Sequence, residues 1–385
     1  MYKVFSSGGF DVVVGNPPYT EDKNYDHLDL KIIKARNKND KNKSLLFNSR
    51  NCGNTHAYFT ERSIKVLKNG GFFGFIVPLS LVSTDRMGSI REFIHNNSSE
   101  VKYFNFDDGA GKIFSGLEHC RATIVITRKD GRVDFVTTSK YHRWYTRDRP
   151  KLLKNLKTCK WKIIDTREII PKIGTELEIE IIQKLNRKSE GKSIRDFIKT
   201  DGVKIWYHNA PQYWIHAHFE EYLPKTEYYE GYKEENTVKI PYELRATKIS
   251  SHYKSLTFDE RNAWIVCGLL NSSLFYWWFV VWSDGRDLLT QHITTFPIDL
   301  DNFPQDKEKQ LRSLVKDLME SYEKNSNIKI NLRSGGYVIK IKEIIPQKSK
   351  DIIDQIDEIF AEYFDFTTKE REFIRNFDIT FRMKN

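Results

Sequence analysis

The sequence predicts half of a doubly wound α/β sheet, followed by a mixed α+β region and C-terminal helices. Three observations support this prediction. Residues 10–129 alternate between short apolar runs and segments with apolar residues at helical spacing. Residues 175–300 are irregular and rich in aromatic side chains. Residues 305–324 and 349–376 again carry apolar residues at helical spacing.

The N-terminal region is expected to contain four strands and two helices. The run FDVVVGN (10–16) is continuously apolar and ends at a Gly-Asn-Pro-Pro turn, which predicts a buried parallel strand. A helix is expected over 56–71, because its apolar spacing ends in a Gly-Gly C-cap signal. The remaining elements are a buried strand at 72–78, a helix at 87–97, and strands at 101–108 and 121–129. This β–α–β order indicates half of a doubly wound, Rossmann-like sheet.

The later part of the chain is less regular. Short strands are expected at 203–209 and 221–229, and an Asn-Ser-Ser cap predicts a buried helix within 270–285. We therefore divide the chain into a sheet domain, a basic linker, a mixed α+β domain and a helical C-terminal part. Their expected bounds are 1–135, 136–174, 175–300 and 301–385.

The composition narrows the class of protein. With 39% hydrophobic and 30% charged residues, the 385-residue chain can form real cores, which excludes wholesale disorder. It has no apolar run of about 18 residues, so no membrane span is predicted, and its first residues lack a signal-peptide layout, so a cytoplasmic protein is expected. The net charge of +10 indicates a polyanionic partner, most often nucleic acid. The four cysteines are widely spaced, and no metal site is predicted.

The segment Asn16, Pro17, Pro18 and Tyr19 is the strongest candidate for chemistry. It follows the first strand, and open α/β sheets bind ligands outside the carboxyl ends of their strands. The two prolines stiffen the loop and remove two backbone donors, which leaves carbonyls and the Asn16 amide oxygen as acceptors. A rigid pair of acceptors beside an aromatic ring suits a planar group with an amino function. The alternative is an ordinary turn that ends a strand.

Several segments together resemble one family. FDVVVGNPPY (10–19) resembles the catalytic motif of S-adenosylmethionine-dependent amino-methyltransferases, in particular gamma-class adenine-N6 DNA methyltransferases. Residues 67–84, 111–129 and 269–298 resemble further segments of TaqI-like enzymes and of type IIG restriction–modification proteins. This resemblance implies a methyltransferase sheet followed by a target-recognition domain.

The resemblance also implies roles for individual residues. Asn16 and the Pro17 carbonyl would accept hydrogen bonds from the amino group of the target adenine, and Asn16 and Pro18 would also border the cofactor. Tyr19 would stack on the flipped base, and Phe114 matches a second aromatic residue that packs against it. Flipping is required because a methyl donor cannot reach the amino nitrogen within the base stack. The alternative for Phe114 is a core residue at the entrance of a strand.

One departure from the family concerns the cofactor. The family binds S-adenosylmethionine through a Gly-containing motif on a strand that lies many tens of residues before the catalytic motif, whereas nine residues precede the first strand here. We therefore expect the C-terminal part of a methyltransferase, as a split-gene subunit, a pseudogene product or a mis-started reading frame. The cofactor pocket would not be complete in this chain. A half-sheet has an exposed edge, which predicts poor solubility or an upstream-encoded partner for residues 1–135.

Basic segments are the candidates for contact with double-stranded DNA. Residues 31–50 hold seven Lys or Arg against one Asp, and residues 140–172 hold eleven Lys or Arg against three acidic residues. The favoured phosphate contacts are Arg143, Arg147, Arg149 and Lys151, with a solvated surface as the alternative. Arg286 and Gln291 are of types that read base edges, and His292 is interpreted as structural or as a DNA contact.

The leading hypothesis is a site-specific adenine-N6 DNA methyltransferase of a restriction–modification system, or its C-terminal part, inactive alone. A second hypothesis is a non-catalytic DNA-binding specificity subunit. A third, a methyltransferase acting on protein glutamine or RNA, ranks last because a long region follows the α/β part.

Overall fold

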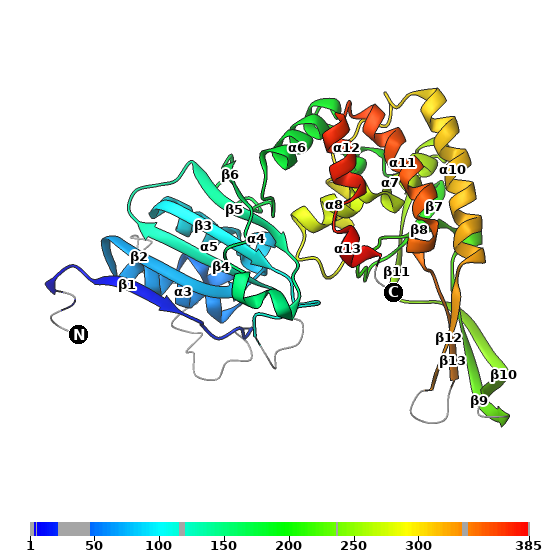
Figure 1. Cartoon of the computed structure of the whole chain (residues 1–385), viewed down its shortest axis with the longest axis horizontal. Helices are drawn as coiled ribbons and strands as arrows, with labels where there is room; N and C mark the ends of the chain where they lie inside the picture. Colours follow the sequence, from blue (N-terminus) through cyan, green and yellow to red (C-terminus); the bar gives the residue numbers. More distant parts are fainter. Residues whose placement is uncertain are drawn as a thin grey trace. The chain divides into compact units, whose positions relative to one another are not determined.

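The computed structural model describes residues 4, 6–21, 47–114, 120–235, 238–332 and 338–383. The chain forms two compact units. Unit 1 comprises Met1–Ile179 with Val280–Asp284, and unit 2 comprises Glu180–Phe279 with Gly285–Asn385. The predicted fold class is confirmed: a six-stranded mixed sheet is followed by two smaller sheets and C-terminal helices (Figure 1).

Unit 1 is built on the six-stranded sheet. Its strand order is β1-β2-β4-β3-β5-β6, in which β1, β2, β3 and β5 run parallel and β4 and β6 run antiparallel to them. The strands are β1 Phe10–Gly15, β2 Leu67–Pro78, β3 Ser98–Phe106, β4 Ala122–Lys129, β5 Phe135–His142 and β6 Thr158–Lys162. The helices are η2 Asn48–Asn51, α3 Thr55–Val66, α4 Ser80–Ser83, η3 Asp85–Met87, α5 Gly88–Asn96 and η4 Thr146–Lys151.

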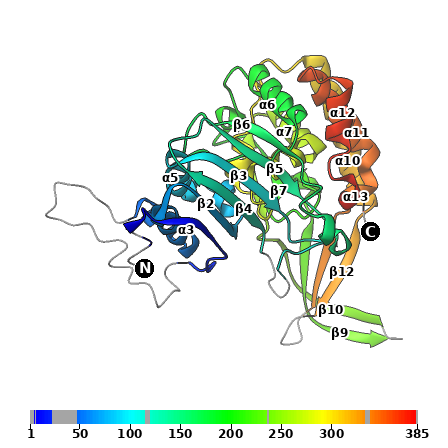
Figure 2. The same ribbon diagram turned by 60° about the vertical axis from the view of Figure 1, so that its left-hand side comes forward.

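One face of this sheet forms the core of unit 1. Alternate residues of β2, namely Phe73, Phe75 and Val77, are buried, and α3 and α5 pack on β2 and β3. Figure 1 and Figure 2 show both helices on the same side of the sheet. Helix α3 begins where the Asn54 side chain accepts a hydrogen bond from the His56 amide, an N-cap that satisfies a helix-terminal donor.

Two features of unit 1 differ from the sequence expectations. Strand β1 is parallel to β2 as predicted, but it is an edge strand and largely exposed. The helix expected over 56–71 ends at Val66, and Gly70 lies within β2 with a φ of 78°. The register between β1 and β2 shifts between Phe10 and Val12, because β2 has extra residues at this point. Gly70 is one of them, and glycine tolerates the left-handed backbone that it adopts.

The expected basic linker also has a different structure. Residues 136–174 include most of β5 and all of β6, which extend the first sheet beyond the predicted boundary at 135. The buried residues of β5 are Val136, Thr138, Ser139 and Tyr141. Because Thr138 and Ser139 are polar, the sequence shows no apolar alternation that would mark this strand.

Unit 2 combines two antiparallel sheets with helices. The sheets have the orders β10-β9-β13-β12 and β11-β7-β8. The strands are β7 Val203–His208, β8 Ala217–Phe219, β9 Lys225–Glu235, β10 Val238–Ile249, β11 Tyr253–Phe258, β12 Asn327–Leu332 and β13 Val338–Glu343. The helices within or entering unit 2 are α6 Glu176–Lys188, η5 Ile194–Phe197, η6 Glu220–Tyr222, α7 Glu260–Asn271, α8 Ser273–Trp282, α9 Thr290–Thr294, α10 Gln305–Lys324, η7 Pro346–Ser349, α11 Lys350–Tyr363, α12 Thr368–Arg375 and α13 Ile379–Arg382.

The most apolar stretch of the sequence is divided between α7 and α8. The Asn-Ser-Ser segment marks the break between them, as expected for a cap, and the two helices are bent by 70°. Among the described residues, no single helix has the length and apolarity needed to cross a membrane. The bent pair of α7 and α8 has that length and apolarity only when its two helices are counted together.

Candidate functional site

The segment 16–19 lies at the carboxyl end of β1. Because β1, β2, β3 and β5 are parallel, their carboxyl ends meet at one edge of the sheet. Asn16 follows β1, Leu79 follows β2, Asp107 follows β3 and Arg143 follows β5. This is the edge where open α/β sheets bind ligands, and the segment 16–19 lies at it.

Contacts from two neighbouring elements fix the loop in place. The Tyr19 hydroxyl donates a hydrogen bond of 2.7 Å to the Ile76 carbonyl on the neighbouring strand β2. The Thr55 hydroxyl lies 2.6 Å from the Pro18 carbonyl and 3.1 Å from the Thr20 carbonyl, and it accepts a hydrogen bond from the Thr20 amide. The Thr55 amide in turn donates to the Thr20 carbonyl at 2.9 Å. The first turn of α3 and the end of β2 therefore hold the loop from two directions.

The two aromatic residues predicted to meet a base lie together. The ring centroids of Tyr19 and Phe114 are 6.2 Å apart and their planes are inclined by 66°, an edge-to-face arrangement. Burial raises the pKa of the Tyr19 hydroxyl well above its usual range, and Cys120 adds to this shift. Tyr19 thus stays neutral at physiological pH and presents an uncharged aromatic ring.

The loop also presents polar acceptors. Asn16 is exposed and Pro17 is buried. Within the described part of the chain, neither the Asn16 side chain nor the Pro17 carbonyl has a hydrogen-bond partner. The Pro18 carbonyl is occupied by Thr55. Asn16 and Pro17 therefore keep the acceptor capacity that the sequence argument requires of them.

A buried charge cluster supports the same edge of the sheet. Asp107 accepts hydrogen bonds from the Tyr141 hydroxyl at 2.6 Å and from Arg143 Nε at 3.1 Å, and Arg121 Nε lies 3.5 Å from it. Arg121 Nε also lies 3.3 Å from Asp108. Burial alone would raise the pKa of Asp107, but Arg143, the Tyr141 hydroxyl and Arg121 together lower it below its ordinary value. Asp107 is therefore held as a carboxylate.

This cluster changes the interpretation of Arg143. The sequence predicts Arg143 on a phosphate-binding surface, whereas in the structure it is 8% exposed and paired with Asp107. Its guanidinium also lies over the Tyr141 ring. The geometry gives Arg143 a structural role, because a guanidinium buried against a carboxylate cannot reach a DNA backbone without breaking that pair.

The other three predicted phosphate contacts lie in η4 and are exposed. Arg149 donates to the carbonyls of Lys112 and Ile113, immediately before Phe114, and stacks on the Trp144 ring. Arg147 stacks on Tyr145. The basic helix η4 is thus tied to the segment that carries Phe114. Residues 31–46 of the other basic stretch lie outside the described residues.

The predicted base-reading residues lie in unit 2. Arg286 and Gln291 are exposed. His292 is 6% exposed, its ring nitrogen Nδ1 accepts a hydrogen bond from the Leu289 amide at 3.1 Å, and its carbonyl accepts one from Trp278. These contacts support the structural interpretation of His292 over the DNA-contacting one.

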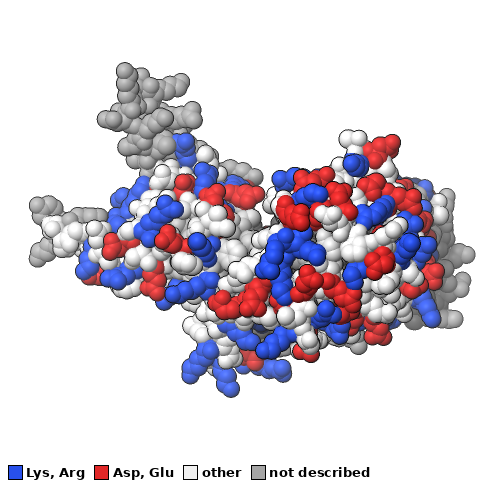
Figure 3. Space-filling view, turned by 90° about the horizontal axis from the view of Figure 1, so that it is seen from above, with Lys and Arg blue, Asp and Glu red and all other residues white. Residues whose placement is uncertain are grey.

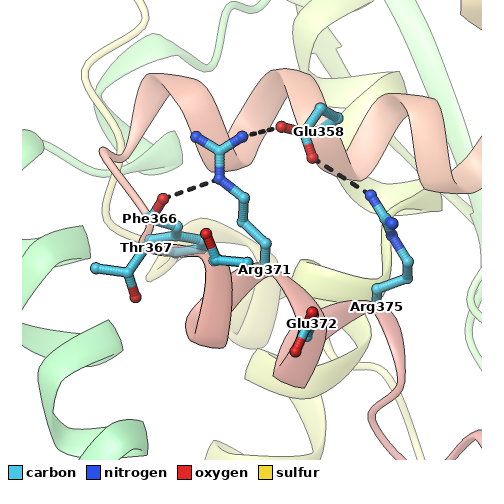
Figure 4. A pocket seen from close by; sticks show the side chains of 7 residues that line it. Glu358, Phe366, Thr367, Arg371, Glu372 and Arg375 are labelled. Atoms are coloured by element: carbon cyan, nitrogen blue, oxygen red, sulfur yellow. Dashed lines mark hydrogen bonds and ion pairs between the residues drawn. The ribbon is translucent and has the colours of Figure 1, made fainter.

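A surface pocket of unit 2 is a weaker candidate for a functional site than the loop 16–19. In Figure 4, Arg371 and Arg375 both point from α12 toward Glu358 of the neighbouring helix α11. Arg375 Nη2 lies 3.3 Å from Glu358, and Arg371 Nε donates to the Phe366 carbonyl at 2.9 Å. Its cations are therefore neutralised within the pocket. On the face drawn in Figure 3, basic and acidic side chains are likewise interspersed, so the net charge of +10 does not form one uniform basic surface there.

Thr55, the Ile76 carbonyl and Asp107 are site residues that the sequence argument missed. Thr55 and Ile76 lie 37 and 57 positions from the loop residues they contact, so no local pattern joins them. Asp107 offered a signal, because an acidic pair directly after a parallel strand lies at the same sheet edge as Asn16.

Comparison with known proteins places the N-terminal part of the chain. Residues 1–114 match the family described as Eco57I restriction-modification methylase. The chain is 26% identical over 207 residues to the type II restriction enzyme and methyltransferase RM.Eco57I of Escherichia coli, which covers 52% of this chain and 19% of that protein. It is 32% identical over 108 residues to the type II methyltransferase M.HincII of Haemophilus influenzae, which covers 28% of this chain and 20% of that protein.

A solved structure is similar over most of the chain. The nuclease-deletion mutant of the type ISP restriction-modification enzyme LlaGI, in complex with a DNA substrate mimic, matches 97% of this chain and 45% of that one. The identity is 13% and the TM-score 0.39. The chain spans about a fifth of the length of the two curated relatives. Its N-terminal part is therefore similar to restriction–modification DNA methyltransferases, whose length extends well beyond the matched region.

Proposed function

We propose that this chain carries the catalytic loop and the DNA-binding part of a restriction–modification DNA methyltransferase that acts on the N6 amino group of adenine. The observation that carries the proposal is the anchored loop 16–19 together with the ring pair of Tyr19 and Phe114. Among the described residues, neither the Asn16 side chain nor the Pro17 carbonyl of this loop has a hydrogen-bond partner. The match of residues 1–114 to a restriction-modification methylase family supports it.

The proposed chemistry depends on how the amino group is held. The Asn16 amide oxygen and the Pro17 carbonyl accept its two N–H bonds, which draws the nitrogen lone pair out of conjugation with the ring and makes it available for attack on a methyl carbon. As the new nitrogen–carbon bond forms, the bond between that methyl carbon and the sulfur of its donor would break, with the electron pair leaving on sulfur. The methylated, positively charged amino nitrogen then loses one of its N–H protons to solvent. Both acceptors lie on a loop anchored to β2 and α3, so little rearrangement is needed when the base arrives.

The rings of Tyr19 and Phe114 form the surface on which the flipped base would bind. Taking adenine out of the duplex costs a few kcal/mol of stacking and pairing. Tyr19 and Phe114 offset part of that cost by packing against the extruded ring from different sides. The hydrogen bond from Tyr19 to Ile76 fixes the orientation of its ring before the base enters. Exposed cations hold the DNA around the flipped base. Arg147 and Lys151 are the favoured ones, because they lie on η4 beside Arg149, which contacts the segment that carries Phe114.

S-adenosylmethionine is the methyl donor that this family resemblance implies. Asn16 and Pro18 fit one wall of its site, because they lie at the carboxyl end of β1 with the Asn16 side chain exposed. Of the described strands, none pairs with the free side of β1, so these residues do not enclose a cofactor by themselves. When bound, the cofactor supplies an electrophilic methyl group. The reaction takes place where the cell keeps its DNA, which in a bacterium is the cytoplasm.

Methyl transfer to DNA tests this proposal. The chain, mixed with the polypeptide encoded directly upstream, is incubated with unmethylated plasmid and S-adenosylmethionine labelled in its methyl group. We expect label in the DNA, and we expect Asn16→Ala to lower its rate at least a hundredfold. Asn96→Ala, an exposed asparagine at the end of α5, is the matched control and should retain full activity. Label that persists with Asn16→Ala refutes the site assignment, and duplex binding without any transfer favours a non-catalytic specificity subunit.

A further inference from the structure

The segment that carries Phe114 is held differently from the loop that carries Tyr19. Loop 16–19 is fixed by hydrogen bonds to α3 and β2. Residues 111–114 belong to neither a helix nor a strand. Within the described ranges, the only hydrogen bonds of this segment are those that the Arg149 side chain donates to it. The position of the second aromatic ring therefore depends on a residue of η4.

Arg149 binds two consecutive carbonyls of this segment. Its Nη1 donates to the Ile113 carbonyl at 3.3 Å, and its Nη2 donates to the Lys112 carbonyl. The same guanidinium lies over the Trp144 ring, 5.2 Å from the ring centroid. Trp144 is 3% exposed, so its ring is a fixed support for the guanidinium. A planar fork of donors stacked on an aromatic ring is a geometry that arginine provides and lysine does not.

Trp144 also restricts which residue can occupy position 111. Gly111 is buried, and a β-carbon built on it would lie 2.6 Å from Cδ2 of the Trp144 ring and 2.7 Å from the Trp144 carbonyl oxygen. Non-bonded heavy atoms prefer separations of about 3.5–4.0 Å, so only glycine lets the segment lie against Trp144 without displacing it. Residues 111–113 are thus held by Trp144 directly at one end and by Arg149 at the other.

We propose that Arg149 is a positioning residue for base binding: it fixes residues 111–113, and so places the Phe114 ring beside Tyr19, instead of contacting a DNA phosphate. This inference rests on the proposed function, in which both rings receive the flipped adenine. The ring centroids are 6.2 Å apart in the absence of DNA, so the pair is already assembled before a base arrives.

The cations of η4 accordingly divide into two kinds. Arg149 directs its donors at carbonyls of its own chain. Arg147 and Lys151 are exposed, and within the part of the chain that the structure describes their side chains form no hydrogen bond or ion pair. A phosphate oxygen can therefore bind Arg147 or Lys151 without displacing another acceptor, whereas a phosphate that drew Arg149 away would release the segment that carries Phe114.

Limited digestion of the free chain by trypsin tests whether Arg149 holds the segment. Trypsin cleaves after Lys112, and cleavage requires the chain around that bond to open locally. Mass spectrometry should show that Arg149→Ala accelerates cleavage after Lys112 about fivefold or more, because two hydrogen bonds to a charged donor are lost. The matched control is Arg147→Ala, since Arg147 is also exposed on η4 and stacks on an aromatic ring, that of Tyr145, at 5.1 Å. It should leave this cleavage unchanged.

Gly111→Ala is a second variant that disturbs the segment from its other end. The added methyl group displaces the segment from Trp144, so cleavage after Lys112 should again accelerate. Unchanged hydrogen exchange in β3 and β4 of each variant shows that the sheet is intact. Cleavage after Lys112 that neither Arg149→Ala nor Gly111→Ala accelerates overturns the inference.

Binding to duplex DNA separates the positioning role from a phosphate contact. The affinity of the chain for a duplex is measured over a range of salt concentrations. Arg149→Ala should leave the slope of log affinity against log salt unchanged, whereas Arg147→Ala should reduce the slope by about 0.9, the value for one phosphate. A slope that Arg149→Ala reduces by that amount assigns Arg149 to a phosphate and overturns the inference.

A double-mutant cycle tests whether Arg149 acts through Phe114. Methyl transfer is measured at saturating DNA, with the same mixture as for Asn16→Ala. Arg149→Ala should lower the rate about tenfold with the half-saturating DNA concentration unchanged, and Arg149→Lys should not restore the rate, because lysine lacks the planar fork. In a chain that already carries Phe114→Ala, Arg149→Ala should lower the rate by less than about twofold, because residues that act through one another are not additive. Equal effects in both backgrounds indicate a merely structural role and overturn the inference.

The outcomes distinguish this inference from the proposed function. If the unmodified chain methylates DNA and Arg149→Ala changes neither the cleavage nor the rate, the inference fails and the proposed function stands. If the unmodified chain transfers no methyl group to DNA, the proposed function fails and the inference fails with it.

Discussion

Replacing Thr55 by valine tests whether the first turn of α3 anchors the catalytic loop. Valine matches threonine in shape, so the change removes the hydroxyl that contacts the Pro18 carbonyl at 2.6 Å and accepts from the Thr20 amide at 3.3 Å, and leaves the packing intact. Thr55 is fully buried, and leaving a buried polar group without its partner costs about 1–3 kcal/mol. The loop should therefore open about 5 to 150 times more often.

Native-state hydrogen exchange measures this opening directly. The Thr55 amide donates to the Thr20 carbonyl, so exchange in peptides covering 18–21 and 54–56 reports the local equilibrium. We expect it to accelerate by that factor in Thr55→Val, with little change in β3. The matched control is Thr60→Val in the same helix: Thr60 is equally buried, and its hydroxyl has no hydrogen-bond partner among the described residues. Unchanged exchange in Thr55→Val, or equal changes in both variants, would refute the anchoring argument.

Three further predictions concern the same unit. Asp107→Asn should destabilise the carboxyl edge of the sheet by about 3–5 kcal/mol, because it leaves the buried Arg143 guanidinium without its carboxylate. Hydrogen exchange of β3 and β5 at increasing urea concentration measures this loss of stability, and a loss under about 1 kcal/mol would contradict the prediction. Burial lowers the pKa of His56 to about 3, so below pH 6.5 the unfolded chain binds a proton that the folded chain does not. The free energy of unfolding should therefore fall between pH 6.5 and 3, by up to about 1.4 kcal/mol per pH unit. In a series of thermal melts, His56→Leu should flatten that decline, and an unaltered slope would count against this prediction. Replacing Arg147 and Lys151 by glutamine should reduce the slope of log affinity for duplex DNA against log salt by about 0.9 for each phosphate that the variant no longer neutralises, whereas an unchanged slope would remove η4 from the interface.

The sequence predicted the elements whose signals are local. The C-terminal helix over 305–324 has the same bounds as α10, because its apolar residues recur at helical spacing along one uninterrupted stretch. The parallel pairing of β1 followed from the β–α–β order, and the position of Asn16 at the carboxyl edge followed from that pairing. Tyr19 and Phe114 were assigned to one site from a resemblance, and the fold brings their rings within 6.2 Å.

What the sequence could not predict depends on distant partners. A run such as FDVVVGN is equally suited to a central or an edge strand, so the exposure of Val14 depends on which strands lie beside it. Arg143 resembled a surface cation because its carboxylate partner, Asp107, lies 36 positions away. The helix expected through Gly71 stops at Val66, because Leu67 pairs with Phe10 of β1 and the two glycines that follow have low helix propensity.

The identity of the methylated base tests the central claim most directly. DNA is treated with S-adenosylmethionine and the chain, supplemented with the product of the coding sequence upstream of it. The DNA is then digested to nucleosides, and the methylated products are quantified by mass spectrometry. We predict N6-methyldeoxyadenosine from the unmodified chain and its disappearance with Asn16→Ala. Methyl groups on cytosine, or N6-methyldeoxyadenosine that is undiminished by Asn16→Ala, would show that the loop at the end of β1 does not hold an adenine for methylation.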